Sequence, residues 1–191
     1  MNARWIGLNA AGEGAGIAGV ALSYALVDRG LAAPWIILVA GAWEGLCLGA
    51  AQVLGFRPPA ARWIGATMVM AVLGYAGSLG MGAGGDDSAA PAFWLILAAG
   101  AGMGLVLGSL MGLAQALSSR GTVAVGRWTL ANLVGWVPAM MLIMAGASLA
   151  ERSWPLAGVA ALGALTGVLA GVVIGVATAY ALPTKSRRSG E

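Results

Sequence analysis

The sequence predicts an all-α integral membrane protein, a six-helix transmembrane bundle built from three parallel two-helix repeats. Hydrophobic residues make up 60% of the 191 residues and charged residues only 9%, whereas about a quarter of a soluble domain is charged. Apolar runs of roughly 20 residues, the length that crosses a bilayer, recur along the chain. The even-numbered runs also share a glycine pattern that returns at a constant spacing of 63 residues, which indicates an internal repeat.

We expect one domain over residues 1–191, with spans at about 5–26, 34–56, 62–82, 92–118, 127–149 and 155–181. Their continuous apolar character favours helices, because the strands of a membrane barrel alternate between apolar and polar residues. The first run is too long for a typical signal-peptide core and no small-residue cleavage site follows it. We therefore expect it to remain as the first span.

Each even-numbered span carries a ladder of glycines four residues apart. Residues at this spacing lie on one side of a helix, and small residues there allow helices in lipid to approach closely. The ladders therefore predict packing seams, each ended by a polar clamp; a pore-lining or ligand-binding glutamine is the alternative. The ladders are Gly41, Gly45, Gly49 and Gln52; Gly104, Gly108, Gly112 and Gln115; and Gly167, Gly171, Gly175 and Thr178.

The odd-numbered spans also begin alike. Each opens with an Arg-Trp pair and has a small polar residue four positions after the tryptophan: Arg4-Trp5 with Asn9, Arg62-Trp63 with Thr67, and Arg127-Trp128 with Asn132. Because each repeat holds two spans, its copies enter the membrane in the same direction and are related by an axis along the membrane normal. The sequence therefore predicts a pseudo-threefold bundle.

The charges of the loops predict the orientation. Eight of the ten cations fall on the face of the N-terminus, and only Arg29 and Arg152 fall on the other. Cytoplasmic loops of membrane proteins carry an excess of Lys and Arg. We therefore expect a protein of the inner membrane with both termini in the cytoplasm. We also expect Trp5, Trp63 and Trp128 to anchor the spans at the membrane interface. The eight cations are Arg4, Arg57, Arg62, Arg120, Arg127, Lys185, Arg187 and Arg188.

Two carboxylates break the repeat inside the membrane. The positions that correspond to Glu13 hold Ala71 and Trp136, and those that correspond to Glu44 hold Leu107 and Ala170. Both lie roughly nine residues from a tryptophan at a span end, about 13 Å deep and near the middle of the bilayer. A charge at that depth costs about 2.5–3.5 kcal/mol.

Glu13 and Glu44 therefore predict a midplane site for a proton, a cation or a small solute. Asn9 shares a helical face with Glu13, and Trp43 or Trp136 would complete the site, because an aromatic face beside a carboxylate suits an organic cation. The alternative is structural, a protonated glutamic acid that clamps two helices by hydrogen bonds. Pro138 falls within the fifth span, where it predicts a kink that serves as a hinge or is simply tolerated.

The composition argues against catalysis and against nucleic-acid binding. The chain has no histidine, which removes imidazole bases and histidine-ligated metals or haem. The glycines lie within apolar helices and do not follow strands, so they do not predict a phosphate loop. Asp86 and Asp87 fit a solvated turn better than a metal site. We therefore expect that the protein is not an enzyme and binds no cofactor and no metal. We expect the Lys and Arg side chains of the loops to contact lipid headgroups.

The pattern G-x-x-x-G-x-x-Q, followed after a short basic loop by Trp, resembles one in uncharacterised bacterial multi-pass membrane proteins. Gly45-Gly49-Gln52 with Trp63, and Gly108-Gly112-Gln115 with Trp128, carry the resemblance. It implies the fold and the membrane location and no activity.

Two functions follow as expectations. The first is a small transport protein that uses the midplane carboxylates. The second is a non-catalytic membrane subunit that docks a partner complex through its glycine-rich helix faces. The lipid bilayer is the expected partner in both cases, with a membrane protein or a second copy of the chain as a further one.

Overall fold

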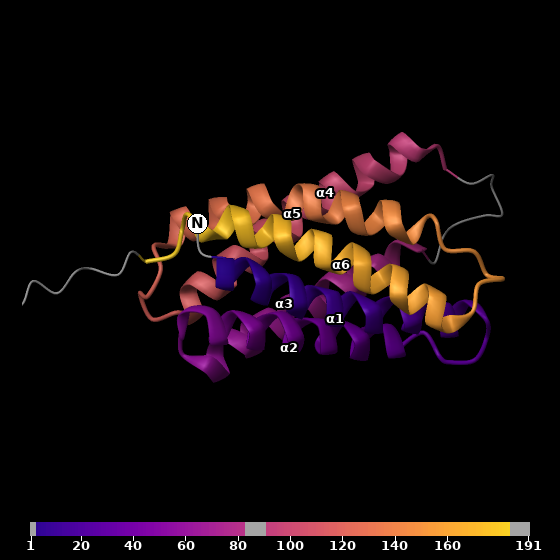
Figure 1. Cartoon of the computed structure of the whole chain (residues 1–191), viewed down its shortest axis with the longest axis horizontal. Helices are drawn as coiled ribbons and strands as arrows, with labels where there is room; N and C mark the ends of the chain where they lie inside the picture. Colours follow the sequence, from indigo (N-terminus) through magenta and orange to yellow (C-terminus); the bar gives the residue numbers. More distant parts are fainter. Residues whose placement is uncertain (1–2, 83–90, 184–191) are drawn as a thin grey trace, which may run out of the picture.

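The structure is a computed structural model that describes residues 3–82 and 91–183, and within these ranges it contains six helices and no strand (Figure 1). Lys185, Arg187 and Arg188 of the charge count, and Asp86 and Asp87, lie outside the described residues. The helices are α1 (Ala3–Asp28), α2 (Ile36–Phe56), α3 (Ala60–Gly82), α4 (Phe93–Ser118), α5 (Val125–Ala147) and α6 (Leu156–Ala179).

The six helices form a closed ring in chain order. Each helix packs against the helix before it and the helix after it, and α6 returns to pack against α1. Among these neighbours, α3 and α4 contact each other least. Figure 1 shows the beginning of α4 leaning away from the other helices at one end of the bundle.

Glycine seams hold α2 on α3, α4 on α5, and α6 on α1. A Cβ atom at Gly45 would lie 2.5 Å from the Met68 Cα, and one at Gly104 would lie 2.5 Å from the Trp136 carbonyl oxygen. A Cβ atom at Gly167 would likewise lie 2.5 Å from the carbonyl oxygen of Glu13. Each ladder thus joins its own repeat to the first helix of the next, where backbones touch.

Five of the six helices are long and apolar enough to cross a membrane, judged by length and composition over the described residues; α3 is not among them. Large apolar side chains point outward around the bundle, including Val39, Leu54, Leu105, Leu130 and Leu165. An outer surface of this kind is suited to lipid and not to water. The apolar helices therefore indicate a membrane protein, and the prediction of long apolar helices is confirmed for these five.

The tryptophans at the starts of the odd helices differ from the prediction. Trp5, Trp63 and Trp128 are each 0% exposed, so they are not interfacial anchors. Their rings pack together inside the bundle, with centroids 5.3 Å apart for Trp63 and Trp128 and 6.1 Å apart for Trp5 and Trp128. Phe56 fills the same cluster. We call this end of the bundle the tryptophan end. Trp35 and Trp94, in contrast, are 64% and 66% exposed.

Each of these three indoles donates a hydrogen bond to the polar residue that ends a glycine ladder. The Nε1 of Trp63 donates to Gln52 Oε1 (2.9 Å), that of Trp128 to Gln115 Oε1 (3.1 Å), and that of Trp5 to Thr178 Oγ1 (3.0 Å). A buried indole N–H group needs a hydrogen-bond acceptor. These three hydrogen bonds therefore hold the indoles in place at the tryptophan end.

The polar residue that ends the third glycine ladder, Thr178, has a shorter side chain than Gln52 and Gln115 at the other two positions. Gln52 Nε2 also donates to Asn9 Oδ1 (3.0 Å), and Gln115 Nε2 donates to Thr67 Oγ1 (3.0 Å). Thr178 has no amide to offer, and the buried Oδ1 of Asn132, the corresponding atom in the third repeat, has no hydrogen-bond partner within the described residues.

Replacing Thr178 by glutamine is expected to stabilise the protein. The longer side chain can accept from Trp5 and donate to Asn132 Oδ1, as Gln52 and Gln115 do in their repeats. One hydrogen bond to a buried, unpaired acceptor is worth about 1 kcal/mol, which reversible unfolding in detergent would measure. Thr178→Val, which removes the existing acceptor, should lower stability; equal stability of both variants would contradict this account.

Candidate functional site

A large cavity lies on the axis of the bundle, between the tryptophan end and the opposite end. Its volume is about 1080 Å³, and residues from all six helices line it. Asp28, Arg29, Glu151 and Arg152, in and beside the α1–α2 and α5–α6 connections, also belong to its lining. Because these residues lie at the end of the bundle away from the three buried tryptophans, the cavity opens there. We call this the open end, and the space the central cavity. The central cavity also reaches the outer surface between α3 and α4, where its lining residues Leu73, Val106 and Leu110 are 55%, 62% and 49% exposed.

Most of the cavity wall is apolar. Methionines from three helices line it, together with aliphatic side chains such as Ile17 and Leu107. Methionine is flexible and polarisable and adapts to ligands of irregular shape. The methionines are Met70 on α3, Met103 and Met111 on α4, and Met140 and Met144 on α5.

Residue size at one level of the bundle explains where the cavity stops. The three corresponding positions Glu13, Ala71 and Trp136 differ greatly in volume, and all three are buried. Ala71 lines the cavity, whereas Trp136 belongs to the core cluster that also contains Leu48, Met111 and Ile174. The large indole fills the axis at this level, and the small alanine leaves space beside it.

A carboxyl–phenol pair is the main polar feature inside the cavity. Tyr75 Oη donates to Glu44 Oε2 at 2.5 Å, and both residues line the space. Gly41 makes room for the tyrosine, since a Cβ atom there would lie 2.5 Å from the Tyr75 ring. Gly16 on α1 makes room for Glu44 in the same way, with a Cβ position 2.7 Å from the Glu44 Cγ. Glycines on α1 and α2 thus position the pair.

Glu13 lies one helical turn before Gly16, and its carboxyl group is close enough to that of Glu44 for the two to interact. Its side chain is 0% exposed, and within the described part of the chain neither of its carboxyl oxygens has a hydrogen-bond partner. A buried carboxylate without a partner is very costly, and a carboxyl group in such a place is stable when it carries a proton or meets a cation. The sequence prediction that Glu13 and Glu44 come together agrees with this geometry.

A second polar contact lies between Glu44 and the mouth of the cavity. The hydroxyl groups of Tyr24 and Ser78 are 2.9 Å apart, and the rings of Tyr24 and Tyr75 have centroids 6.4 Å apart. At the mouth, Arg152 Nε lies 3.5 Å from Asp28 Oδ2. Polar groups therefore follow one another along the α1–α3 side, from the open end to the two glutamates.

Of the other predicted site residues, Asn9 and Trp43 lie away from the cavity. Asn9 is buried at the tryptophan end, where its amide donates to the Trp5 carbonyl oxygen (2.9 Å) and accepts from Gln52. Trp43 is 48% exposed on the outside of the bundle and donates to the Ala15 carbonyl oxygen (3.1 Å). Trp136 is buried, and its Nε1 has no hydrogen-bond partner in the described residues. Pro138 lies inside α5, away from the central cavity.

Tyr75, Tyr24 and Ser78 were not predicted, although the repeats contain the signal. Ile17 and Met140 occupy the positions that correspond to Tyr75, and both line the cavity. A tyrosine where two other copies carry an aliphatic residue or methionine is the same kind of departure that identified Glu13. The sequence prediction considered only carboxylates and tryptophans as departures from the repeat, and a phenol is a weaker signal because it carries no charge at neutral pH.

The geometry therefore defines a mainly apolar cavity that is lined by the Glu44–Tyr75 pair, with the carboxyl group of Glu13 buried beside Glu44. Such a site is suited to binding a molecule with a large apolar part and one cationic group. No protein-family model, curated protein or solved structure matches this chain.

Proposed function

We propose that this protein binds an amphipathic organic cation in the central cavity and takes part in its transport across a bacterial inner membrane. The observation that carries the proposal is the pair of Glu44 and Tyr75 in an otherwise mainly apolar space of about 1080 Å³. The apolar wall accepts the hydrocarbon part of the ligand, and Glu44 pairs with the cation. Tyr24 and Tyr75 offer aromatic faces on which a quaternary or primary ammonium group is stable.

Glu13 has a different role in this proposal, as the group that holds a proton. It is more deeply buried than Glu44 and does not line the cavity. Binding of a cation at Glu44 places positive charge close to Glu13 and favours release of that proton, because the cation stabilises the carboxylate that remains. Exchange of a cation for a proton is the corresponding transport cycle.

The membrane arrangement belongs to the same proposal. With α3 as the sixth span, the three repeats form a pseudo-threefold bundle and both termini lie in the cytoplasm. The closed ring of helices and the three similar glycine seams support this arrangement. The central cavity then opens toward the outer side of the membrane, and the tryptophan end lies at the cytoplasmic side.

The alternative function, a membrane subunit that docks a partner through glycine-rich faces, receives less support. The ladder glycines pack against helices of the same chain, where a Cβ atom at Gly108 would already lie 2.9 Å from the Leu133 Cα. A partner would have to displace α1, α3 or α5 to reach these faces. We therefore favour the cavity as the functional part.

Glu44→Gln is expected to weaken cation binding by about thirtyfold or more, since truncating one partner of a buried charge pair typically costs about 2 kcal/mol or more. The probe is phenylbutyltrimethylammonium, a permanently charged amphipathic cation, and isothermal titration of the protein in nanodiscs measures its binding. Glu151→Gln is the matched control, because Glu151 is an exposed carboxylate that also lines the cavity. Glu13→Gln should retain binding and lose proton-driven uptake of the probe into proteoliposomes.

Phenylbutanol separates charge recognition from simple partition into an apolar space. It has a similar hydrocarbon part without the cation, so it should bind weakly and equally to the wild-type protein and Glu44→Gln. Equal binding of the cation and the alcohol by the wild-type protein would refute the proposed function. Retention of uptake in Glu13→Gln would refute the role given to Glu13.

A further inference from the structure

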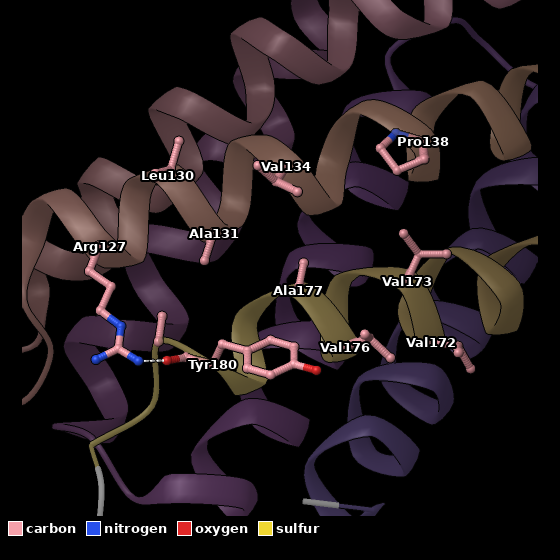
Figure 2. Close-up of a pocket in the computed structure, with 11 residues that line it drawn as sticks. Arg127, Leu130, Ala131, Val134, Pro138, Val172, Val173, Val176, Ala177 and Tyr180 are labelled. Atoms are coloured by element: carbon pink, nitrogen blue, oxygen red, sulfur yellow. Dashed lines mark hydrogen bonds between the residues drawn. The ribbon is translucent and has the colours of Figure 1, made fainter. Parts of the chain in front are cut away.

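A second groove lies on the outside of the bundle, between α5 and α6. Its volume is about 640 Å³, and it is separate from the central cavity. Figure 2 shows Arg127 at one end of the groove and Pro138 at the other end along α5, with valines of α6 on the opposite wall. Apart from Arg127 and the hydroxyl group of Tyr180, the side chains that line it are apolar.

The length of the groove matches one leaflet of a bilayer. Arg127 and Pro138 are 11 residues apart on one helix, which corresponds to about 16 Å at a rise of 1.5 Å per residue. Half of the hydrocarbon core of a bilayer is about 15 Å thick. With Arg127 at the interface, the groove ends near the middle of the membrane, as a single acyl chain does.

The charge at the interfacial end identifies the kind of lipid. Arg127 is exposed, and its guanidinium donates one hydrogen bond to the carbonyl oxygen of Tyr180 (Figure 2). A guanidinium has five donors in a planar fork that suits phosphate, so donors remain for a ligand. Basic pockets between transmembrane helices at the cytoplasmic side attract anionic headgroups, and Arg127 belongs to the face with the excess of cations.

The first repeat differs at the positions where this groove is open. Ala15 corresponds to Pro138, and its carbonyl oxygen accepts a hydrogen bond from Trp43, so an indole lies across the α1–α2 surface. In the third repeat Leu169 occupies the position of Trp43. The glycines at Gly16 and Gly19, which bring α1 close to Glu44 and Trp43 of α2, correspond to Ala139 and Leu142. Larger residues on α5 and the missing indole leave the α5–α6 surface hollow.

We propose that the α5–α6 groove binds one anionic phospholipid, with an acyl chain between α5 and α6 and the phosphate on Arg127. The site is independent of the central cavity and of the ligand proposed there. Its occupant would stabilise the junction of α5 with α6, the second helix of the third repeat.

Native mass spectrometry of the full chain, delipidated in mild detergent, tests the proposal. Added phosphatidylglycerol should be retained as one tight adduct, and Arg127→Gln should weaken this retention by about tenfold, the worth of one charge-assisted contact of about 1.5 kcal/mol. Arg62→Gln is the matched control, because Arg62 is the exposed arginine at the same position of the second repeat. Val134→Phe, which fills the groove from an exposed position on α5, should also lose the adduct.

Two further probes distinguish a lipid from its parts. Phosphatidylcholine should be retained less than phosphatidylglycerol, and glycerol phosphate, which has the headgroup without the chains, should not protect the protein from thermal unfolding. Equal retention of the two lipids, equal loss in Arg62→Gln and Arg127→Gln, an unchanged adduct in Val134→Phe, or protection by glycerol phosphate would each overturn the proposal.

Discussion

Replacing Gly104 by alanine is expected to destabilise the protein by about 3 kcal/mol, the upper part of the range for overpacking a close contact. The added Cβ atom would lie 2.5 Å from the Trp136 carbonyl oxygen and 2.6 Å from the Val137 Cα. Both are backbone atoms and cannot rotate away, so α4 must move off α5. The movement also loosens Gly100 and Gly108, which touch the same helix.

Gly102→Ala provides the control on the same helix, two residues away. Gly102 is exposed, and a Cβ atom there meets no atom within 4 Å. Because alanine favours helix by up to about 1 kcal/mol over glycine, this variant should be as stable as the wild type or more stable. Reversible unfolding in mixed detergent micelles measures both. A similar stability of the two variants would show that close packing of the α4–α5 seam is not required.

Gln115→Leu is expected to cost about 3 kcal/mol and to loosen the whole tryptophan end. Gln115 is 0% exposed and connects three residues of three other helices. Its Nε2 donates to Gln52 Oε1 (2.9 Å) and Thr67 Oγ1 (3.0 Å), and its Oε1 accepts from Trp128. Leucine has a similar volume but leaves the Trp128 N–H buried and unpaired, which costs about 1–3 kcal/mol in addition to the two lost bonds.

Ser109→Ala controls for the loss of a hydrogen bond on α4. Ser109 donates to the carbonyl oxygen of Leu105, one turn earlier on the same helix, so its removal affects no other helix and should change stability by less than about 0.5 kcal/mol. Unfolding in detergent and the near-ultraviolet signal of the tryptophans report on the two variants. Wild-type behaviour of Gln115→Leu would mean that the clamp does not hold the indoles.

Much of the fold could be predicted because only a few backbone structures can satisfy their hydrogen bonds in lipid. Long apolar runs must satisfy their own backbone groups and therefore form helices, and the six helices lie where these runs lie. The glycine ladders were expected to be seams, and the structure places them between α2 and α3, between α4 and α5, and between α6 and α1. The order of packing, with each ladder on the next repeat, was not visible in the spacing of glycines, because a ladder shows one face and not the helix that meets it.

The tryptophans show where a rule about single residues failed. An Arg-Trp pair at the start of a span is typical of an interfacial anchor, yet Trp5, Trp63 and Trp128 point inward and bind the clamps. The cause is the packing of α6 against α1, which closes the ring of helices and brings the N-terminal ends of α1, α3 and α5 together. Contacts between segments far apart in the sequence cannot be predicted from a local pattern. The position of Trp43, on the outside of the bundle against α1, could not be predicted for the same reason.

The candidate site was predicted in part. Glu13 and Glu44 were identified because they break the repeat, and Gly16, between α1 and α2, places them side by side. The size of the cavity depends on the sum of small residues such as Ala71 and Gly102 on several helices, together with the lean of α4. No segment by itself encodes such a volume.

The sealed tryptophan end has an electrical consequence for a protein of this shape. In the proposed membrane arrangement, with water in the central cavity, the cavity extends the medium of one side inward as far as Glu44, and most of the membrane voltage falls across the remaining segment around Trp5, Trp63 and Trp128. One elementary charge that crosses that segment exchanges about 2.3 kcal/mol for every 100 mV. In that arrangement the packed indoles form the electrically insulating part of the protein. The energy of a charge that moves past them changes with the membrane potential.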